Sequence, residues 1–411
     1  MKLTSEEQAM LSGEHGSACK WALEHMLQVG RQFDAQDFVP VSQAHMMGDP
    51  ESLGEAGVRF LERLVEDSAK VAIPTITDPR GVDLTYYREL GQTETMASLE
   101  RRIIKACSSM GILLTNTCIC YQTILPPVRG DHVAFGDTGV VIYTNSVLGA
   151  YSNFEGGPSA LAAGLTGRTP RYGPHLDSNR CGTMRFIVRH PPRELTDWGV
   201  LGGIIGRAAG SYWEVPVLEG IDTVPTSDEL KHFGAAMASY GSVPLFHMVG
   251  VTPEAGRIED VFNKIPTSST DIAKSNYEDF RKNFSAKGEK VDVVVFAAPQ
   301  LSLMEISQVA ALLDGRRINK STALFVCTSP GVASDCDRMG LTNKIETCGG
   351  KLLRGTCFYQ QFAREIAQAN GWYHLVSNSA KIVNIIGGYG YKPSLASMEK
   401  CVESAIKGVL V

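Results

Sequence analysis

Several features that mark other protein classes are missing from this 411-residue sequence. Its 39 lysines and arginines nearly balance 44 aspartates and glutamates, and no basic stripe for nucleic acid stands out. No apolar run approaches the ~20 residues that a membrane span requires. Residues 1–7 lack the apolar stretch of a secretory signal peptide. These absences predict a cytoplasmic protein that has neither nucleic acid nor a membrane as its partner.

The ten cysteines do not show the spacing of a zinc site. No pair of CxxC motifs occurs, and the lone CxC of Cys118 and Cys120 is a weak signal. The histidines His45, His132 and His175 also lack the close spacing of zinc ligands. A reducing cytosol keeps thiols free, and most of them are expected to be small core residues. A few remain available for a metal or a cluster.

The length predicts two or three domains. We expect a mainly helical region over residues 1–110, with helices at 5–27, 52–66 and 93–110. An α/β core follows over residues 111–280, with strands expected at 111–114, 139–143, 184–188 and 243–251. The glycine-dense segment 199–210 favours close helix packing, because it does not follow a strand in the dinucleotide-binding manner.

A C-terminal α/β domain is expected over residues 281–411. Val291–Phe296 is a continuous apolar run, which is typical of a strand buried on both faces. Ser302, with Glu305 three residues later, forms a capping box that begins a helix to Leu313. Further strands are expected at 323–326 and 351–353, and helices from residue 332 and over 394–409. This alternation predicts a parallel sheet covered by helices.

The densest group of polar residues lies in the segment 153–182. Gly156, Gly157 and Ser159 surround a proline just before the helix-forming run 160–165, so their N–H groups could bind a carboxylate or phosphate. A simple capped helix start is the alternative interpretation.

The second half of this segment is a loop rich in glycine, proline and polar side chains. Such a loop suits a small substrate with several oxygens. Arg168 could hold a carboxylate through two hydrogen bonds, and His175 could act as a general acid. The other candidate substrate-binding residues in the loop are Tyr172, Asp177 and Asn179. A solvated loop with structural salt bridges is the alternative.

Three shorter segments add candidates for the site. Residues 115–118 follow an expected strand, where sites of α/β proteins collect. Asn145 and Ser146 follow the expected strand 139–143. Ser379 and Lys381 belong to a polar segment that could equally be a helix cap.

Taken together, these motifs resemble the aconitase X family along nearly the whole chain. The segments that carry the resemblance are Thr117–Tyr121, Asn145–Ala150, Asn153–Ala163, Thr166–Arg180, Thr356-Cys357 and Asn378–Lys381. The most specific of them reads T-G-R-T-P-x-Y-G-x-H-L-D-x-N-R. The resemblance implies an aconitase-like α/β fold with several domains, whose parallel or mixed sheets are covered by helices. It also implies a partner, because the family's small swivelling domain has no counterpart here and would be a separate subunit.

The activity implied by the resemblance is that of a hydro-lyase, or dehydratase, which eliminates water from a small hydroxylated carboxylic acid. Family members act on cis-3-hydroxy-L-proline or on mevalonate 5-phosphate. Tyr151 and Phe154 stand where arginines are expected, which favours cis-3-hydroxy-L-proline here. His175 is the candidate acid, and the base would be Lys381, Ser379 or a group of the small subunit.

The resemblance further implies an iron–sulfur cluster, with Cys118 and Cys357 as ligands. A third cysteine is expected after the strand 291–296, where this chain has Ala298, and Gln300 replaces an expected histidine. Two thiolates do not hold a cubane in the usual way. The cluster could therefore be 2Fe–2S, 3Fe–4S or 4Fe–4S, with Cys120, Cys327 or Cys348 as the third ligand.

The missing cysteine leaves an alternative of a different class, namely a cluster-free paralogue that binds or scaffolds. A zinc enzyme is a weaker alternative.

Overall fold

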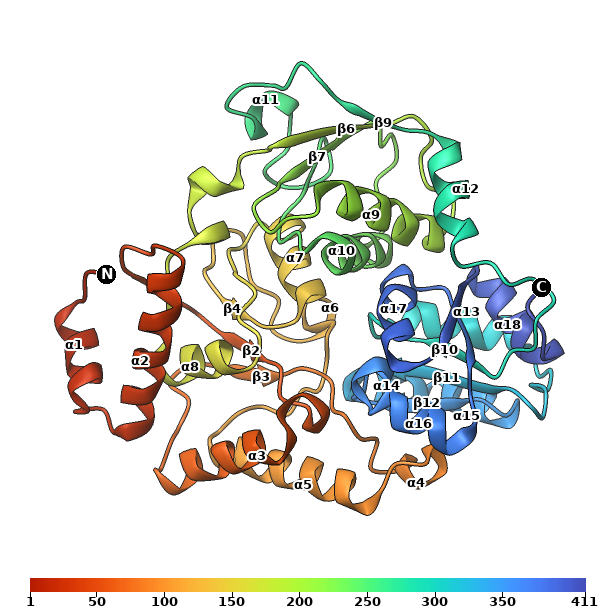
Figure 1. Cartoon of the computed structure of the whole chain (residues 1–411), viewed down its shortest axis with the longest axis horizontal. Coiled ribbons are helices and arrows are strands. Elements are labelled where there is room, and N and C mark those ends of the chain that lie inside the picture. Colours follow the sequence, from red (N-terminus) through yellow and green to blue (C-terminus); the bar gives the residue numbers. More distant parts are fainter.

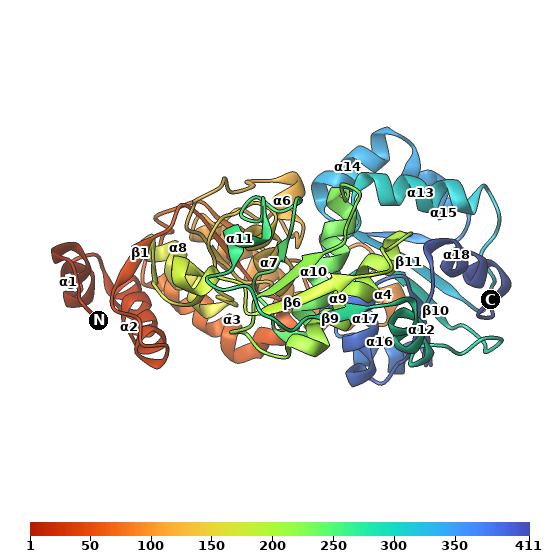
Figure 2. The same ribbon diagram turned by 90° about the horizontal axis from the view of Figure 1, so that it is seen from above.

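The computed structural model describes residues 1–411 and contains three lobes that meet at the centre of the molecule (Figures 1 and 2). Each lobe has its own parallel sheet, and helices cover these sheets. The family-level expectation of parallel sheets covered by helices is therefore confirmed. None of the helices combines the length and hydrophobicity needed to cross a membrane.

The first lobe comprises residues 1–180 and contains a three-stranded sheet in the order β3-β2-β4. Its strands are β2 Ala44–Met46, β3 Thr75–Thr77 and β4 Ala134–Phe135, and an antiparallel pair is formed by β1 Phe38–Pro40 and β5 Arg168–Pro170. Its helices are α1 Ser5–Ser12, α2 Ser17–Gln32, α3 Pro50–Glu66, α4 Tyr87–Leu90, α5 Glu94–Ser109, α6 Cys120–Thr123, α7 Thr138–Ser146 and α8 Pro158–Thr166. The sheet joins residues on both sides of position 110, where the sequence predicts a domain limit.

The second lobe contains a four-stranded parallel sheet in the order β8-β7-β6-β9. The strands are β6 Met184–Val188, β7 Pro216–Glu219, β8 His247–Met248 and β9 Thr270–Ile272. The helices are α9 Leu195–Ala209, α10 Ser227–Gly241, α11 Ile258–Val261 and α12 Lys274–Lys282. Glycines bring α9 and α10 together, because a Cβ at Gly202 or Gly206 would collide with the backbone of α10. The prediction of close helix packing for the segment 199–210 is confirmed.

The third lobe contains a five-stranded parallel sheet in the order β12-β11-β10-β13-β14. The strands are β10 Val293–Phe296, β11 Ala323–Thr328, β12 Lys351–Arg354, β13 His374–Ser377 and β14 Lys392–Leu395. The helices are α13 Leu303–Leu313, α14 Pro330–Arg338, α15 Leu341–Thr347, α16 Ala363–Asn370, α17 Ala380–Ile385 and α18 Met398–Lys407. The capping box of Ser302 and Glu305 is present at the start of α13.

Several expected elements differ from the structure. Residues 139–143 belong to helix α7, not to a strand, because Asp137 caps the helix and the run is buried on all sides. Periodicity alone cannot distinguish a short buried helix from a buried strand. Residues 111–114 form only an isolated bridge between Leu113 and Ile76, and only His247–Met248 of the run 243–251 is a strand.

The expected helices at the two ends of the chain also differ from the structure. The first is divided in two by the left-handed Gly13, which ends α1. The last begins at Met398, because Ser394 and Leu395 extend strand β14.

Candidate active site

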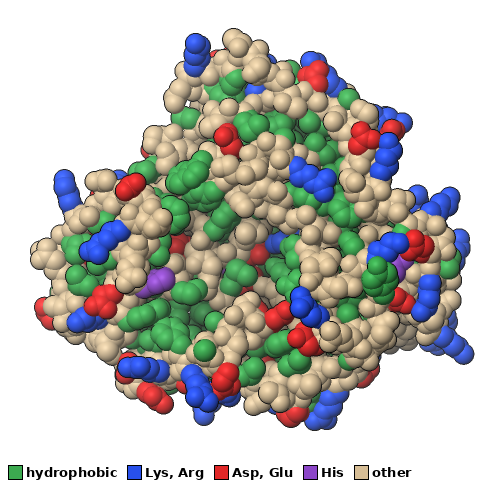
Figure 3. Space-filling model, viewed as in Figure 1, with side chains coloured by type: hydrophobic (Ala, Val, Ile, Leu, Met, Phe, Trp, Pro, Cys, Tyr) green, Lys and Arg blue, Asp and Glu red, His purple; other side chains and the backbone are tan.

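The carboxyl ends of strands from the first and third lobes meet at the centre of the molecule, where the surface is hollowed (Figure 3). In the first lobe, His45 lies in β2, Asp78 follows β3 and Asp137 follows β4. In the third lobe, Cys357 follows β12 and Asn378 follows β13. Parallel sheets commonly place their sites at such strand ends.

Two buried thiols, those of Cys118 and Cys357, lie side by side at this junction. The neighbouring Cys357 thiol, followed by burial, raises the pKa of Cys118 well above its usual value. The loop that carries Cys118 belongs to the first lobe, and Cys357 belongs to the third. The sequence-based expectation that these two cysteines belong together thus agrees with their placement.

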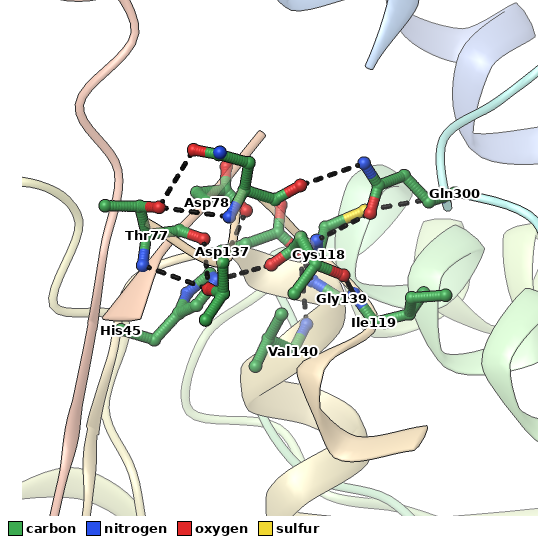
Figure 4. A network of polar contacts seen from close by, with 12 residues as sticks. His45, Thr77, Asp78, Cys118, Ile119, Asp137, Gly139, Val140 and Gln300 are labelled. Carbon is green, nitrogen blue, oxygen red and sulfur yellow. Dashed lines mark hydrogen bonds and ion pairs between the residues drawn. The ribbon is translucent and has the colours of Figure 1, made fainter. Parts of the chain in front are cut away.

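A buried ion pair joins Lys381 to Asp137, with 3.2 Å between Nζ and Oδ2. The other oxygen of Asp137 accepts N–H hydrogen bonds from Gly139 and Val140 at the start of α7 (Figure 4). Burial alone would raise the pKa of Asp137, but Lys381 and the N–H of Val140 lower it. Burial opposes the charge of Lys381 as well, but Asp137 and the two thiols raise its pKa. Both groups are therefore charged near neutral pH.

Asp78 is a second buried carboxyl group in this network. Its Oδ2 accepts a hydrogen bond from Gln360 at 2.9 Å, whereas its Oδ1 has no hydrogen-bond partner and lies 3.5 Å from His45 Nε2. Burial, followed by the charge of Asp137, raises the pKa of Asp78 well above its usual value. Burial lowers the pKa of His45, whose Nε2 lies 2.8 Å from the carbonyl oxygen of Thr117. A protonated carboxyl group thus stands beside a neutral imidazole.

Several polar atoms around the thiols have no protein partner although they are buried. They are both amide atoms of Asn378, the hydroxyl of Thr356, Oδ1 of Asp78 and Nδ1 of His45. Buried polar groups are normally hydrogen-bonded, and leaving one unsatisfied costs about 1–3 kcal/mol. These atoms are suited to contact a bound ligand.

The side chains at this junction do not fit a cluster held by three cysteines of this chain, because a third cysteine is not placed beside Cys118 and Cys357. No group of three such side chains is arranged to hold a metal ion. Ala298 is buried after β10 where the third cysteine is expected, and Cys348 packs in a separate core of the third lobe. Cys120 and Cys327 are fully buried in the central core that also contains Cys118 and Cys357. The chain brings together two thiols.

The predicted acid His175 lies elsewhere, and its Nδ1 is 2.8 Å from Nδ1 of His132. His132 precedes β4, whereas Asp137 follows that strand, so this histidine pair lies at the opposite end of the sheet from the thiols. Burial, followed by the charges of His132 and Arg180, lowers the pKa of His175 well below its usual value. Nε2 of His175 is buried without a partner. The structure does not bring His175 to the thiols.

The other predicted residues of the polar segment also have partners of their own. Arg168 lies 3.3 Å from Glu7 of α1 and lines a cavity of about 720 Å³ between α1, α2 and residues 67–73. Tyr172 stacks on Phe33, with 4.4 Å between the ring centroids. The remaining hydrogen bonds join Asp177 to Tyr151, Asn179 to the carbonyl of Gly173, and Ser159 to His25. The cavity that Arg168 lines is therefore not at the thiols.

Asn145 and Ser146 connect parts of the first and second lobes. Asn145 donates to the carbonyls of Ser152 and Pro244, and Ser146 accepts the N–H of Phe246. Gly156 and Gly157 precede α8, and a Cβ at Gly157 would collide with the carbonyl of Met47. These residues have clear packing roles.

The C-terminal polar segment is divided between the two interpretations. Ser379 accepts the N–H of Ile382 as a helix cap and donates to the carbonyl of Ala298, whereas Lys381 enters the site.

Sequence reasoning missed Asp78 and Asp137, because the strands before them are too short to recognise. The signal available for both was an acidic residue followed by a turn or helix start.

Three family models match the chain, namely the aconitase X first domain over residues 1–178, the second over 182–282 and the third over 291–407. The large subunit of phosphomevalonate dehydratase from Methanothermobacter thermautotrophicus is 36% identical over 94% of each chain. The cis-3-hydroxy-L-proline dehydratase of Hypocrea jecorina is 30% identical over 99% of this chain and 69% of its own. The holo-form crystal structure of Thermococcus kodakaraensis aconitase X has a TM-score of 0.88 at 31% identity and covers 98% of this chain.

Proposed function

Since the chain belongs to the aconitase X family, we propose that it is the large subunit of a dehydratase that removes water from a small hydroxylated carboxylic acid. One observation carries the proposal. The thiols of Cys118 and Cys357, the Lys381–Asp137 ion pair and the partly unpartnered Asp78 carboxyl meet in one buried site. This set combines a fixed cation with a proton donor, and an elimination reaction needs both.

The roles of the charged groups follow from their protonation states. Lys381 keeps its proton, so we assign it to the substrate carboxylate, where it would stabilise the enolate that forms when the neighbouring proton leaves. Asp78 also keeps its proton and has one free oxygen, so it is placed to protonate the departing hydroxyl. A protonated Lys381 cannot accept a proton, and the hydroxyl of Ser379 already donates to the carbonyl of Ala298, so neither is assigned as the base. We therefore assign the base to the partner subunit.

We propose cis-3-hydroxy-L-proline as the substrate, because Tyr151 and Phe154 replace the arginines expected for a phosphorylated one. The ring of Tyr151 lies against the Arg180 guanidinium, and the ring of Phe154 packs against Tyr212. Mevalonate 5-phosphate is the second candidate, and the lengths of the relatives favour it. The phosphomevalonate dehydratase large subunits match over nearly their whole length, whereas the hydroxyproline dehydratases are longer chains.

The same lengths support a small partner subunit, since the hydroxyproline dehydratases extend beyond the matched region by about 30% of their length. We propose that this partner corresponds to the swivelling domain and that the complex is cytoplasmic. An iron–sulfur cluster remains a proposal as well, with Cys118 and Cys357 as the ligands that this chain supplies. No step above depends on it.

The test is a dehydration assay of the assembled two-subunit enzyme with each acid separately. We expect turnover of one acid, and loss of at least about 100-fold in kcat when Lys381 is changed to methionine. The exposed Lys344 provides a matched control, Lys344→Met, with unchanged turnover. Absence of turnover with both acids in a correctly assembled, reconstituted complex would refute the proposal.

A further inference from the structure

Gln300 is fully buried, and its side-chain and backbone hydrogen bonds together reach all three lobes. It follows strand β10 of the third lobe, and its side chain reaches Cys118 of the first lobe (Figure 4). Its backbone carbonyl accepts a hydrogen bond from Lys231 of the second lobe. The chemistry proposed above gives this residue no role.

Two reciprocal hydrogen bonds bind Gln300 to Cys118. The backbone N–H of Gln300 donates to Sγ of Cys118 at 3.3 Å, and Oε1 of Gln300 accepts the backbone N–H of Cys118 at 3.2 Å. Its Nε2 also donates to the carbonyl of Asn116 at 3.2 Å. The loop that carries the first thiol is thus fixed through both its thiol and its backbone.

The same amide group holds the loop of the second thiol. Nε2 of Gln300 donates its other hydrogen to the carbonyl of Thr356 at 3.1 Å, and Thr356 immediately precedes Cys357. One planar amide therefore spans the two loops whose thiols meet. A primary amide has two donors and one acceptor oxygen, and each is used here.

The backbone of Gln300 is itself held from the second lobe. Lys231 Nζ donates to its carbonyl at 3.2 Å. This lysine is fully buried between Asp228, at 3.0 Å, and Glu305, which also pairs with His232 at 2.8 Å. A buried charged network thus holds the backbone of Gln300 in place, and with it the side-chain amide that contacts the two thiol loops.

From these contacts we infer that Gln300 is a positioning residue that sets the separation of the Cys118 and Cys357 thiols. Its amide has the length and the donors to bridge the two loops, and an apolar side chain of the same size would leave three polar backbone groups unpaired. The importance of that separation for turnover rests on the proposed function, but the separation itself can be measured without turnover.

The experiment uses arsenite, which bridges two thiols only when they lie at a suitable separation. One As(OH)₃ condenses with two thiols to form two S–As bonds and releases two waters, so no oxidant is needed. The equilibrium affinity of the full chain, freed of metal, is measured by intact mass and sulfur–arsenic absorbance. Variants Cys118→Ser and Cys357→Ser define the signal of this pair, since each removes it.

We expect Gln300→Met to weaken arsenite binding at least about tenfold. Gln92 provides the matched control, since it is buried and donates to two carbonyls, those of Gly81 and Gln361, but contacts neither Cys118 nor Cys357. Gln92→Met should lower thermal stability to a similar degree and leave arsenite affinity unchanged. Should Gln300→Met fail to fold, Gln300→Glu takes its place. It keeps the acceptor for Cys118 and loses the amide donors to Asn116 and Thr356, and it too should weaken binding.

Equal arsenite affinity in the wild type and in a folded Gln300 variant would overturn the inference, whatever the turnover. Equal weakening by Gln92→Met would also overturn it, because the effect would then be general loosening. Weakened arsenite binding by Gln300→Met alone, in an enzyme that dehydrates neither acid, would support the positioning role and refute only the proposed function.

Discussion

Glu155 shows how burial at a single residue controls a protonation state. Its Oε1 accepts the hydroxyl of Thr169 at 2.7 Å, and its Oε2 has no partner. Burial raises the pKa of this carboxyl to about 7, from 4.5 for an ordinary glutamate. Because the pKa is higher in the folded than in the unfolded chain, the neutral carboxyl of Glu155 contributes stability. This contribution is fully present below pH 4.5 and is lost as the pH rises through 7.

We therefore expect Glu155→Gln to stabilise the protein in alkaline solution. The difference between the two pKa values corresponds to ~3 kcal/mol at most in the free energy of unfolding above pH 7. Chemical denaturation at pH 5 and pH 8.5 measures the effect, which should be clearly larger at the higher pH. The exposed Glu66→Gln serves as control and should show no such pH dependence. An equal effect of Glu155→Gln at both pH values would contradict the prediction.

Ala298 provides a second test at the level of one residue, because it stands where the resemblance places a third cysteine. We expect Ala298→Cys to add a thiol next to the pair and to increase the iron and sulfide retained after anaerobic reconstitution. The measurement is iron and sulfide content per chain, together with the visible spectrum. Ala333→Cys, at a buried position in α14, controls for an added thiol elsewhere. Unchanged iron and sulfide content in Ala298→Cys would argue against a cluster at these thiols.

The residues of the site were only partly accessible to sequence reasoning. Cys118, Cys357 and Lys381 were found through motifs, and the structure places them together. The polar segment 153–182 was found by its local density of polar residues, which does not reveal which side of a sheet they face. The structure places Arg168 beside Glu7 and His175 beside His132. Asp78 and Asp137 were missed because strand pairing, which is non-local, brings them to the thiols.

At the level of elements, the contact between α9 and α10 depends on glycine. A Cβ at Gly202 would collide with the carbonyl of Phe233, and one at Gly206 with the carbonyl of Met237. Alanine at either position should lower stability by about 1–3 kcal/mol through overpacking. Gly331→Ala in α14 is the matched control, because its Cβ would meet no atom within 4 Å. That control should raise stability by about 0.5–1 kcal/mol, since alanine favours helices.

Thermal unfolding of the three alanine variants shows whether each substitution lowers or raises the stability of the protein. A melting temperature for Gly202→Ala or Gly206→Ala at or above that of the wild type would contradict the packing described.

The elements that sequence patterns predicted best are those with local signals at both ends. The helix α13 has its capping box, and β10 is a run of buried β-branched residues and a phenylalanine. Helix α7 was mistaken for a strand because its apolar run is buried all round, so neither a period of 2 nor one of 3.6 is visible. The two- and three-residue strands of the first lobe have no recognisable period at all.

For the whole molecule, the buried network of Lys231 and Glu305 holds the second lobe to the third. Burial alone would raise the pKa of Glu305, but Lys231 and His232 lower it to about 2. Lys231→Met should therefore cost about 3–5 kcal/mol, because it leaves a buried carboxylate without its cation. The double variant Lys231→Met with Glu305→Gln should recover part of this loss.

Denaturant unfolding of the single and double variants tests whether the Lys231–Glu305 pair stabilises the contact between the two lobes. Additive losses in the double variant would show that the two side chains do not act as a pair.

The origin of the two thiols in different lobes also fixes the order in which the site can form during synthesis. Cys118 leaves the ribosome with the first lobe, long before Cys357 has been translated. A nascent chain therefore presents a single thiol at this place for most of its elongation. Any cofactor that requires both thiols can be inserted only after Cys357 has been translated.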